Sequence, residues 1–401
     1  MHQGVAAVCK LPPLRFHLQF KVAQCSAIRY DFLMLIYIAL GIAFVVPLLF
    51  LFLVRKFDLF ATGRYAVNVV TLIWGVIAYL LAVQVNSTAI ELGWATRSQV
   101  IRVIAPIAEE LLKSLILIYL VQRADFNYIV DGAIYGFGAG IGFAIIENYE
   151  YVMGHQEIAL TIAVARVFST NLVHATGSGL IGTVLAYRRG DRSWVGWLFL
   201  LFGYAFSMSF HMGFNTMVNA GGFLIVAIAF GAVGVGLIWY AIRRGLKTQK
   251  EWVGEKLTEA DRATKSETKA LTKIEDLPRE ILAPVEKQFG SDKAKLVQKM
   301  MLRQAEMGIK RKLLDSTPNE GKRREIELLI EDIKKDVKTM RDQIGPYCMM
   351  LVRQVYLEQD IKIWDAIGAR IAQSSTGQVG GGLWDRTGER IKSSKAQEEQ
   401  P

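Results

Sequence analysis

Residues 129–152, IVDGAIYGFGAGIGFAIIENYEYV, decide the fold class of this chain. A helix of this length covers about 36 Å at 1.5 Å per residue, which is enough to cross a hydrocarbon core of about 30 Å. Its five glycines lie inside an apolar helix, so they favour close helix packing over a phosphate-binding loop. Glu147 lies near its far end, and a carboxylate at membrane depth is a functional candidate by default.

Six further apolar stretches flank this one within the first 242 residues. We therefore predict an all-α, polytopic membrane helix bundle of about seven transmembrane helices over residues 32–242, with an N-terminal extension at 1–31. The other predicted spans are 32–54, 66–85, 100–121, 158–187, 194–217 and 222–242.

Residues 243–401 have a different composition. They hold 32 basic and 26 acidic residues, against 15 and 11 in residues 1–242. Apolar residues recur there at helical spacing, which predicts a soluble helical tail with a flexible C-terminus after a Ser/Gly-rich joint. Its basic clusters are interspersed with acidic residues, so we expect a solvated face and a cytoplasmic protein partner, and no nucleic acid.

Three scattered cysteines in the whole chain exclude a disulfide framework.

Basic residues in the short loops predict the orientation of the bundle. With the N-terminus outside, the inside segments carry 11 Lys and Arg and the outside segments 5. We therefore predict a multi-pass protein of a bacterial-type plasma membrane, with its N-terminus out and its tail in the cytoplasm.

Polar side chains within four of the spans form the candidate site. Within each motif they are three or four residues apart, so they share a helix face. With the predicted topology, all four motifs reach the outer half of the bilayer. The motif residues are Glu109, Glu110, Lys113, Phe143, Glu147, His174, His211 and Asn215.

Each motif alone has a simpler explanation. Glu110 and Lys113 are also explained by a buried ion pair, Glu147 by a solvated helix end, and the His211–Asn215 pair by hydrogen bonds that join membrane helices. Arg166 is better explained as a structural counter-ion for a glutamate than as a catalyst. The joint occurrence of the motifs at compatible depth favours a site.

These residues resemble the PrsW-type intramembrane proteases, which are more distantly similar to the CAAX prenyl endopeptidases and their bacterial immunity relatives. The similarity covers about residues 100–217. It rests on APIAEELLK (105–113), GFAIIENYEY (142–151, including Asn148), Asp131-Gly132, the stretch from Arg166 to His174, and HMGFN (211–215). Lys113 and Glu147 favour the PrsW branch over the CAAX branch. The resemblance implies a glutamate-dependent membrane protease that cleaves membrane-anchored proteins, for example anti-sigma factors.

Hydrolysis at membrane depth needs an activated water, a proton donor and oxyanion donors. We expect Glu109 or Glu110, with His174, to activate water, and His211 and Asn215 to orient it or stabilise the oxyanion. Lys113 would balance charge and Glu147 would share the proton or hold His174. The chain has no HExxH, so we expect no metal cofactor.

Zinc is the alternative, and its ligands would then be Glu110, Glu147, His174 and His211. Two other function classes stay open. Ionisable residues on several helices also occur in proton-coupled transporters, although no internal repeat is present here. An inactive membrane scaffold or immunity protein on the protease fold is the third possibility.

Overall fold

The computed structural model describes residues 15–60, 63–190, 193–219, 224–257, 263 and 265–357, and these contain helices and no strands. The predicted all-α membrane bundle is therefore confirmed. Six helical segments in this part of the chain are long and apolar enough to cross a membrane. The membrane helices are α1 (Arg15–Arg55), α2 (Tyr65–Glu91), α4 (Ala105–Leu120), α5 (Ile129–Gly154), α6 (Ala159–Val167), α7 (Thr170–Gly190), α8 (Trp194–Asn219) and α9 (Leu224–Lys256).

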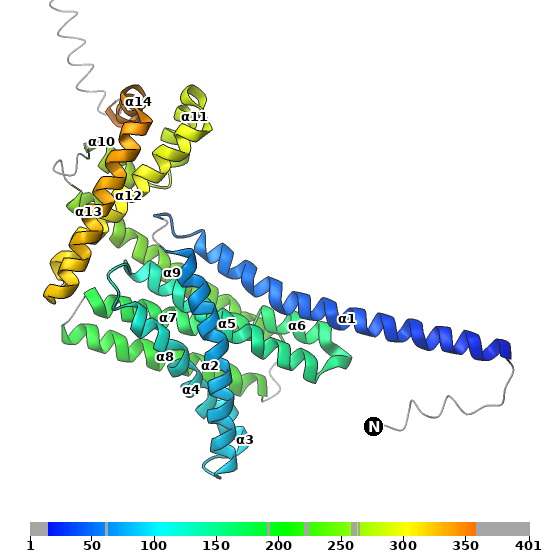
Figure 1. Cartoon of the computed structure of the whole chain (residues 1–401). Coiled ribbons are helices and arrows are strands. Elements are labelled where there is room, and N and C mark those ends of the chain that lie inside the picture. The colour runs from blue at the N-terminus through cyan, green and yellow to red at the C-terminus, as the bar shows by residue number, and fades with distance from the viewer. Residues whose placement is uncertain are drawn as a thin grey trace, which may run out of the picture.

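Helix α5 lies at the centre of the bundle, surrounded by the other membrane helices (Figure 1). Its glycines bring it into backbone contact with its neighbours. A Cβ atom on Gly136 would lie 2.1 Å from the Ser178 carbonyl oxygen of α7, and one on Gly142 would lie 2.0 Å from the Leu72 carbonyl oxygen of α2. Small residues thus fix the distances between α5 and the helices on either side.

The third predicted span, 100–121, is not one regular helix. It consists of the π-helical turn η2 (Val100–Ile104), which follows the short α3 (Arg97–Gln99), and of the short α4, and it is not among the six long apolar segments. The prediction of about seven spans is therefore approximate.

The π-helical turn η2 changes the backbone hydrogen bonds ahead of α4. The Ala105 N–H bonds the Val100 carbonyl, five residues back, instead of the Ile101 carbonyl. The released Ile101 carbonyl accepts a 3.0 Å hydrogen bond from Asn215 Nδ2 on α8. Pro106 at the start of α4 has no N–H and needs no backbone acceptor, which suits a helix start. The turn thus ties α4 to α8.

The fifth predicted span, 158–187, is broken at Phe168 and Ser169 into α6 and α7. The Ser169 N–H bonds the Arg166 carbonyl three residues back, and its hydroxyl donates to the Ala165 carbonyl at 2.6 Å. The tight last turn of α6 therefore ends that helix without a proline or glycine. Helix α7 begins at Thr170 and packs against α5.

The tail forms a small helical domain at one end of the bundle (Figure 1). It is linked to the bundle by α9, which continues to Lys256, beyond the predicted end of the last span at 242. Lys310 Nζ bonds the Ala124 carbonyl of the α4–α5 loop at 2.6 Å, so the tail contacts the membrane domain directly. Residues 358–401, including the predicted flexible end, lie outside the described part. The tail helices are α10 (Lys265–Thr272), η5 (Pro278–Leu282), α11 (Ala283–Phe289), α12 (Ser291–Ser316), α13 (Glu320–Ile344) and α14 (Pro346–Leu357).

Candidate active site

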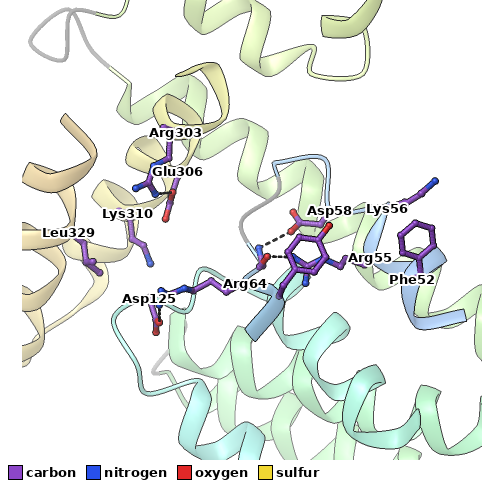
Figure 2. A pocket seen from close by; sticks show the side chains of 12 residues that line it. Phe52, Arg55, Lys56, Asp58, Arg64, Asp125, Arg303, Glu306, Lys310 and Leu329 are labelled. Atoms are coloured by element: carbon purple, nitrogen blue, oxygen red, sulfur yellow. Dashed lines mark hydrogen bonds and ion pairs between the residues drawn. The ribbon is translucent and has the colours of Figure 1, made fainter. Parts of the chain in front are cut away.

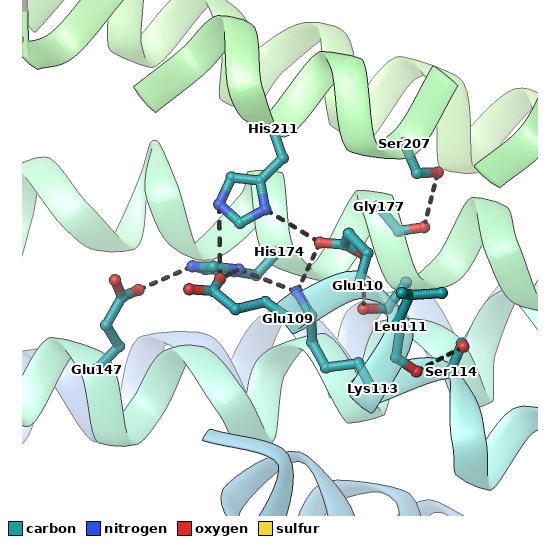
Figure 3. A network of polar contacts seen from close by, with 11 residues as sticks. Glu109, Glu110, Leu111, Lys113, Ser114, Glu147, His174, Gly177, Ser207 and His211 are labelled. Atoms are coloured by element: carbon teal, nitrogen blue, oxygen red, sulfur yellow. Dashed lines mark hydrogen bonds and ion pairs between the residues drawn. The ribbon is translucent and has the colours of Figure 1, made fainter. Parts of the chain in front are cut away.

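Helix α4 places two adjacent glutamates on different partners (Figure 3). Glu110 is fully buried, and its Oε1 accepts hydrogen bonds from Lys113 Nζ at 2.6 Å and from His211 Nδ1 at 3.2 Å. Its Oε2 accepts a longer bond of 3.5 Å from the Ser178 hydroxyl. Both oxygens of Glu110 are therefore occupied by groups of the protein.

His174, on α7, is oriented by groups from three other helices. Its Nε2–H donates to Glu147 Oε2 of α5 at 2.8 Å, and Lys113 Nζ of α4 donates to its Nδ1 at 3.1 Å. Its ring packs on Phe143, with 4.9 Å between centroids, and meets the His211 ring edge-on at 4.6 Å. These contacts fix both the ring and its tautomer.

Arg166, on α6, contacts the same oxygen of Glu147 as His174 does. Its Nη2 is 2.6 Å from Glu147 Oε2, and its Nε donates to Asn148 Oδ1 at 2.9 Å. Arg166 thus forms an ion pair with a site glutamate; its role as a structural counter-ion stays a prediction. All of these contacts of Glu147 are made by Oε2, so Oε1 carries none of them.

Glu109 differs from the other two site glutamates because its buried oxygen, Oε2, has no hydrogen-bond partner among the described residues. The residue is 8% exposed. Oε2 lies 3.9 Å from His174 Nδ1 and 3.8 Å from His211 Nε2. The three side chains offer ligand atoms that all lie within 4.8 Å of one another.

This cluster has the donor set of a catalytic zinc site, two imidazoles and one carboxylate, and three protein ligands leave the fourth tetrahedral position to water or substrate. The second nitrogen of each imidazole is hydrogen-bonded to a carboxylate, Glu147 for His174 and Glu110 for His211. Because each of these bonds uses the ring proton, the lone pairs lie on the other nitrogens, His174 Nδ1 and His211 Nε2, which face Glu109. Metal-binding histidines usually donate their second ring N–H to a carboxylate or carbonyl in this way.

Distances and charge also fit a divalent ion. The 3.8 and 3.9 Å separations from Glu109 Oε2 are slightly wider than the ~3.4 Å edge of a tetrahedron with bonds of about 2.05 Å, so these two edges need only a small contraction. The two imidazole nitrogens lie within 4.8 Å of each other. Three glutamates against two cations, Lys113 and Arg166, leave the site with a formal charge of −1 when both histidines are neutral. Metal binding requires Lys113 to give up its contact with His174 Nδ1 and to keep its contact with Glu110.

Asn215 lies one helical turn beyond His211, but its amide nitrogen is bonded to the Ile101 carbonyl of η2. Its predicted role as an oxyanion donor stays a prediction. Sequence reasoning missed Ser178 and Ser207. Ser178 donates to Glu110, and Ser207 donates to the Gly177 carbonyl at 3.1 Å. Each serine is four residues from a site histidine, so the spacing that linked His211 with Asn215 would have found both.

A family model matches residues 63–242, and it describes a PrsW family intramembrane metalloprotease. No curated protein and no solved structure matches this chain significantly. The matched range includes every predicted motif, from the Glu109 pair to Asn215, and none of the tail beyond residue 242.

The prediction that no metal cofactor is needed was wrong. The family is described as metalloproteases, and the structure holds a suitable Glu109, His174 and His211 cluster. The absence of HExxH misled the sequence argument, because that motif supplies two ligands from one helix whereas here α4, α7 and α8 supply one each. The zinc alternative named Glu110 and Glu147, which in the structure hold the histidines from outside the cluster.

Proposed function

We propose that this chain hydrolyses peptide bonds of membrane-anchored protein substrates at the Glu109–His174–His211 cluster, because its residues 63–242 match the model of the PrsW family of intramembrane metalloproteases. The observation that supports this most is the unpartnered Oε2 of Glu109 opposite two imidazole lone pairs. A buried carboxylate oxygen without a donor is costly unless a cation or a substrate group completes it.

Glu109, His174 and His211 would hold zinc in this site. Bound zinc supplies Lewis acidity and lowers the pKa of a water molecule to about 7. Glu110 and Glu147 orient the two imidazoles and keep their lone pairs turned inward. Lys113 neutralises Glu110 and packs its ammonium 4.7 Å from the Phe143 ring centroid, which shields this ion pair from water.

Glu147 is our candidate for the proton carrier. Glu110 has both oxygens bonded and no exposure, whereas the Glu147 side chain is 17% exposed and its Oε1 makes none of the contacts described above. Oε1 would accept a proton from the attacking water and return it to the leaving amide nitrogen. Arg166 holds Oε2 and so keeps the carboxylate turned toward the histidines.

The proposed orientation places the site in the outer half of the bilayer. Arg64 pairs with Asp125 at 2.8 Å, Arg189 donates to the Phe126 carbonyl at 3.1 Å, and Lys310 bonds the Ala124 carbonyl. The α1–α2, α4–α5 and α7–α8 connections thus lie on the side of the tail, and the first and last of these three are rich in basic residues. With a cytoplasmic tail, substrates would be cut near their outer membrane boundary.

The test is reconstitution of the purified chain with a library of single-span membrane peptides, with cleavage scored by mass spectrometry and bound zinc measured in the same preparation. We expect about one zinc per chain, loss of cleavage on chelation and recovery with zinc. Glu109→Gln and His211→Ala should each lose bound zinc and reduce cleavage more than about 100-fold.

Glu157→Gln is the matched control, because Glu157 is an exposed carboxylate in the α5–α6 connection. It should keep both zinc and cleavage. Folded, membrane-inserted Glu109→Gln protein that still cleaves at the wild-type rate would exclude the proposed site. Cleavage that survives complete removal of zinc would exclude the role of the metal.

A further inference from the structure

A charged cavity lies where the tail meets the membrane domain (Figure 2), and none of its lining residues belongs to the site described above. Its volume is about 690 Å³, which is within the usual range for small-ligand sites. Its walls come from the end of α1, the α1–α2 connection, Asp125 of the α4–α5 loop, and helices α12 and α13 of the tail.

Basic groups outnumber acidic ones in this cavity. Five of the lining residues are basic and three are acidic. The acidic side chains already have donors from the protein. Asp58 accepts from the Gly63 N–H at 2.8 Å, Asp125 pairs with Arg64 at 2.8 Å, and Glu306 pairs with Arg303 at 2.5 Å. The excess positive charge is therefore available to an anion.

Two cations lack a carboxylate partner among the described residues. Arg55 donates to the Gly63 carbonyl and lies over the Tyr65 ring, but its Nη1 is buried and makes no hydrogen bond there. Lys310, on α12, is 1% exposed and bonds only the Ala124 carbonyl. Because burial removes water from the ammonium group, the pKa of Lys310 falls to about 8. Neither group forms an ion pair with a carboxylate of the described residues, although Glu306, Asp131 and Asp125 lie near enough to Lys310 to oppose the fall of its pKa.

The position of the cavity relative to the membrane indicates which anion it binds. The first apolar segment, Phe32–Arg55, ends at the cavity wall. Phe52, on this last turn, is half exposed, and Lys56 lies over its ring. Arginine and lysine at the end of a membrane-crossing helix lie at the level of lipid phosphates. A guanidinium also matches the geometry of phosphate oxygens.

We propose that this cavity binds the phosphate group of an anionic phospholipid from the leaflet on the side of the tail, with Arg55 and Lys310 as its main ligands. One headgroup would contact α1 of the membrane domain and α12 of the tail together. The lipid would therefore stabilise the docking of the tail on the bundle, and anionic lipid content would control how firmly the tail is held.

The experiment uses the full chain in nanodiscs of phosphatidylcholine alone or with phosphatidylglycerol added. Native mass spectrometry after release measures retained lipid, and limited proteolysis measures tail docking. We expect selective retention of phosphatidylglycerol and at least a tenfold slower tail cleavage in its presence. Arg55→Gln and Lys310→Met should abolish both effects, whereas Lys310→Arg, which keeps the charge, should retain them.

Lys338→Gln is the control for loss of one basic group, because Lys338 is exposed on tail helix α13 away from the cavity. It should behave as wild type. Equal retention of both lipids, or unchanged behaviour of folded Arg55→Gln and Lys310→Met, would overturn the proposal. A third arm adds inorganic phosphate to phosphatidylcholine nanodiscs. Protection of the tail by millimolar phosphate alone would assign the cavity to a soluble phosphate compound and overturn the lipid assignment.

Discussion

Substitution of Gly140 by alanine should disable the site without removing any of its polar side chains. Gly140 lies on α5 against the backbone of His174 on α7. A Cβ atom there would be 2.4 Å from the His174 carbonyl oxygen and 2.5 Å from the Ala175 Cα. Both neighbours are backbone atoms within a helix, so neither can rotate away.

The expected displacement follows from these distances. Ordinary contacts of a Cβ begin at 3.4 Å, so α7 must move away from α5 by about 1 Å at His174. Overpacking of this kind costs about 1–3 kcal/mol. Because His174 Nε2 is held by Glu147 of α5 and its Nδ1 faces Glu109 of α4, a 1 Å shift affects both contacts. Misplacement by about 1 Å can reduce catalysis about 100-fold.

Two matched glycines separate local from general effects. A Cβ on Gly132, also between α5 and α7, would meet the Gly182 carbonyl oxygen at 2.2 Å. That clash is about 12 Å along the helix from Gly140. Gly236 on α9 has nothing within 4 Å of a built Cβ. We expect Gly132→Ala to lower thermal stability as much as Gly140→Ala with a smaller loss of zinc and cleavage, and Gly236→Ala to change none of them.

The assay measures melting temperature, bound zinc and peptide cleavage for the three variants in one lipid mixture. Folded Gly140→Ala protein with wild-type zinc content and cleavage would refute the reasoning, because it would show that the α5–α7 distance does not set the position of His174. Equal loss of cleavage in Gly132→Ala and Gly140→Ala would assign the effect to general destabilisation.

The remaining predictions concern orientation and the buried lysine of the tail. In a variant without Cys9 and Cys25, a cysteine at Glu157 should react with an impermeant thiol reagent on intact cells, and one at Lys338 should not; the reverse pattern would place the site toward the cytoplasmic leaflet. The pKa of Lys310 is lowered from 10.5 to about 8 in the folded protein. The unfolded chain therefore holds one more proton between these pH values, so wild type should gain stability over Lys310→Met by about 1.4 kcal/mol per pH unit above pH 8 in neutral lipid. Parallel pH profiles of thermal unfolding for the two proteins would contradict a buried lysine.

The sequence alone determined the membrane bundle and the residues that gather in the site. Length and hydropathy fix a transmembrane helix because the bilayer has a fixed thickness and its core offers backbone groups no other partners. Ionisable residues such as Glu109 and His211 stand out in such a helix because burial in hydrocarbon is costly without function. Helical periodicity then places motif residues on one face, so their convergence was predictable.

Tertiary packing decided the role of each residue. Glu109 and Glu110 are adjacent, so their side chains point about 100° apart around α4. Only the rotation of α4 against α7 and α8 turns the Glu109 carboxylate toward the two histidines and the Glu110 carboxylate toward Lys113. The same packing breaks the fifth stretch at Ser169 and gives Asn215 the carbonyl released by the π-helical turn. Such outcomes depend on contacts between helices distant in the chain, and periodicity within one helix carries no information about the rotation of its neighbour.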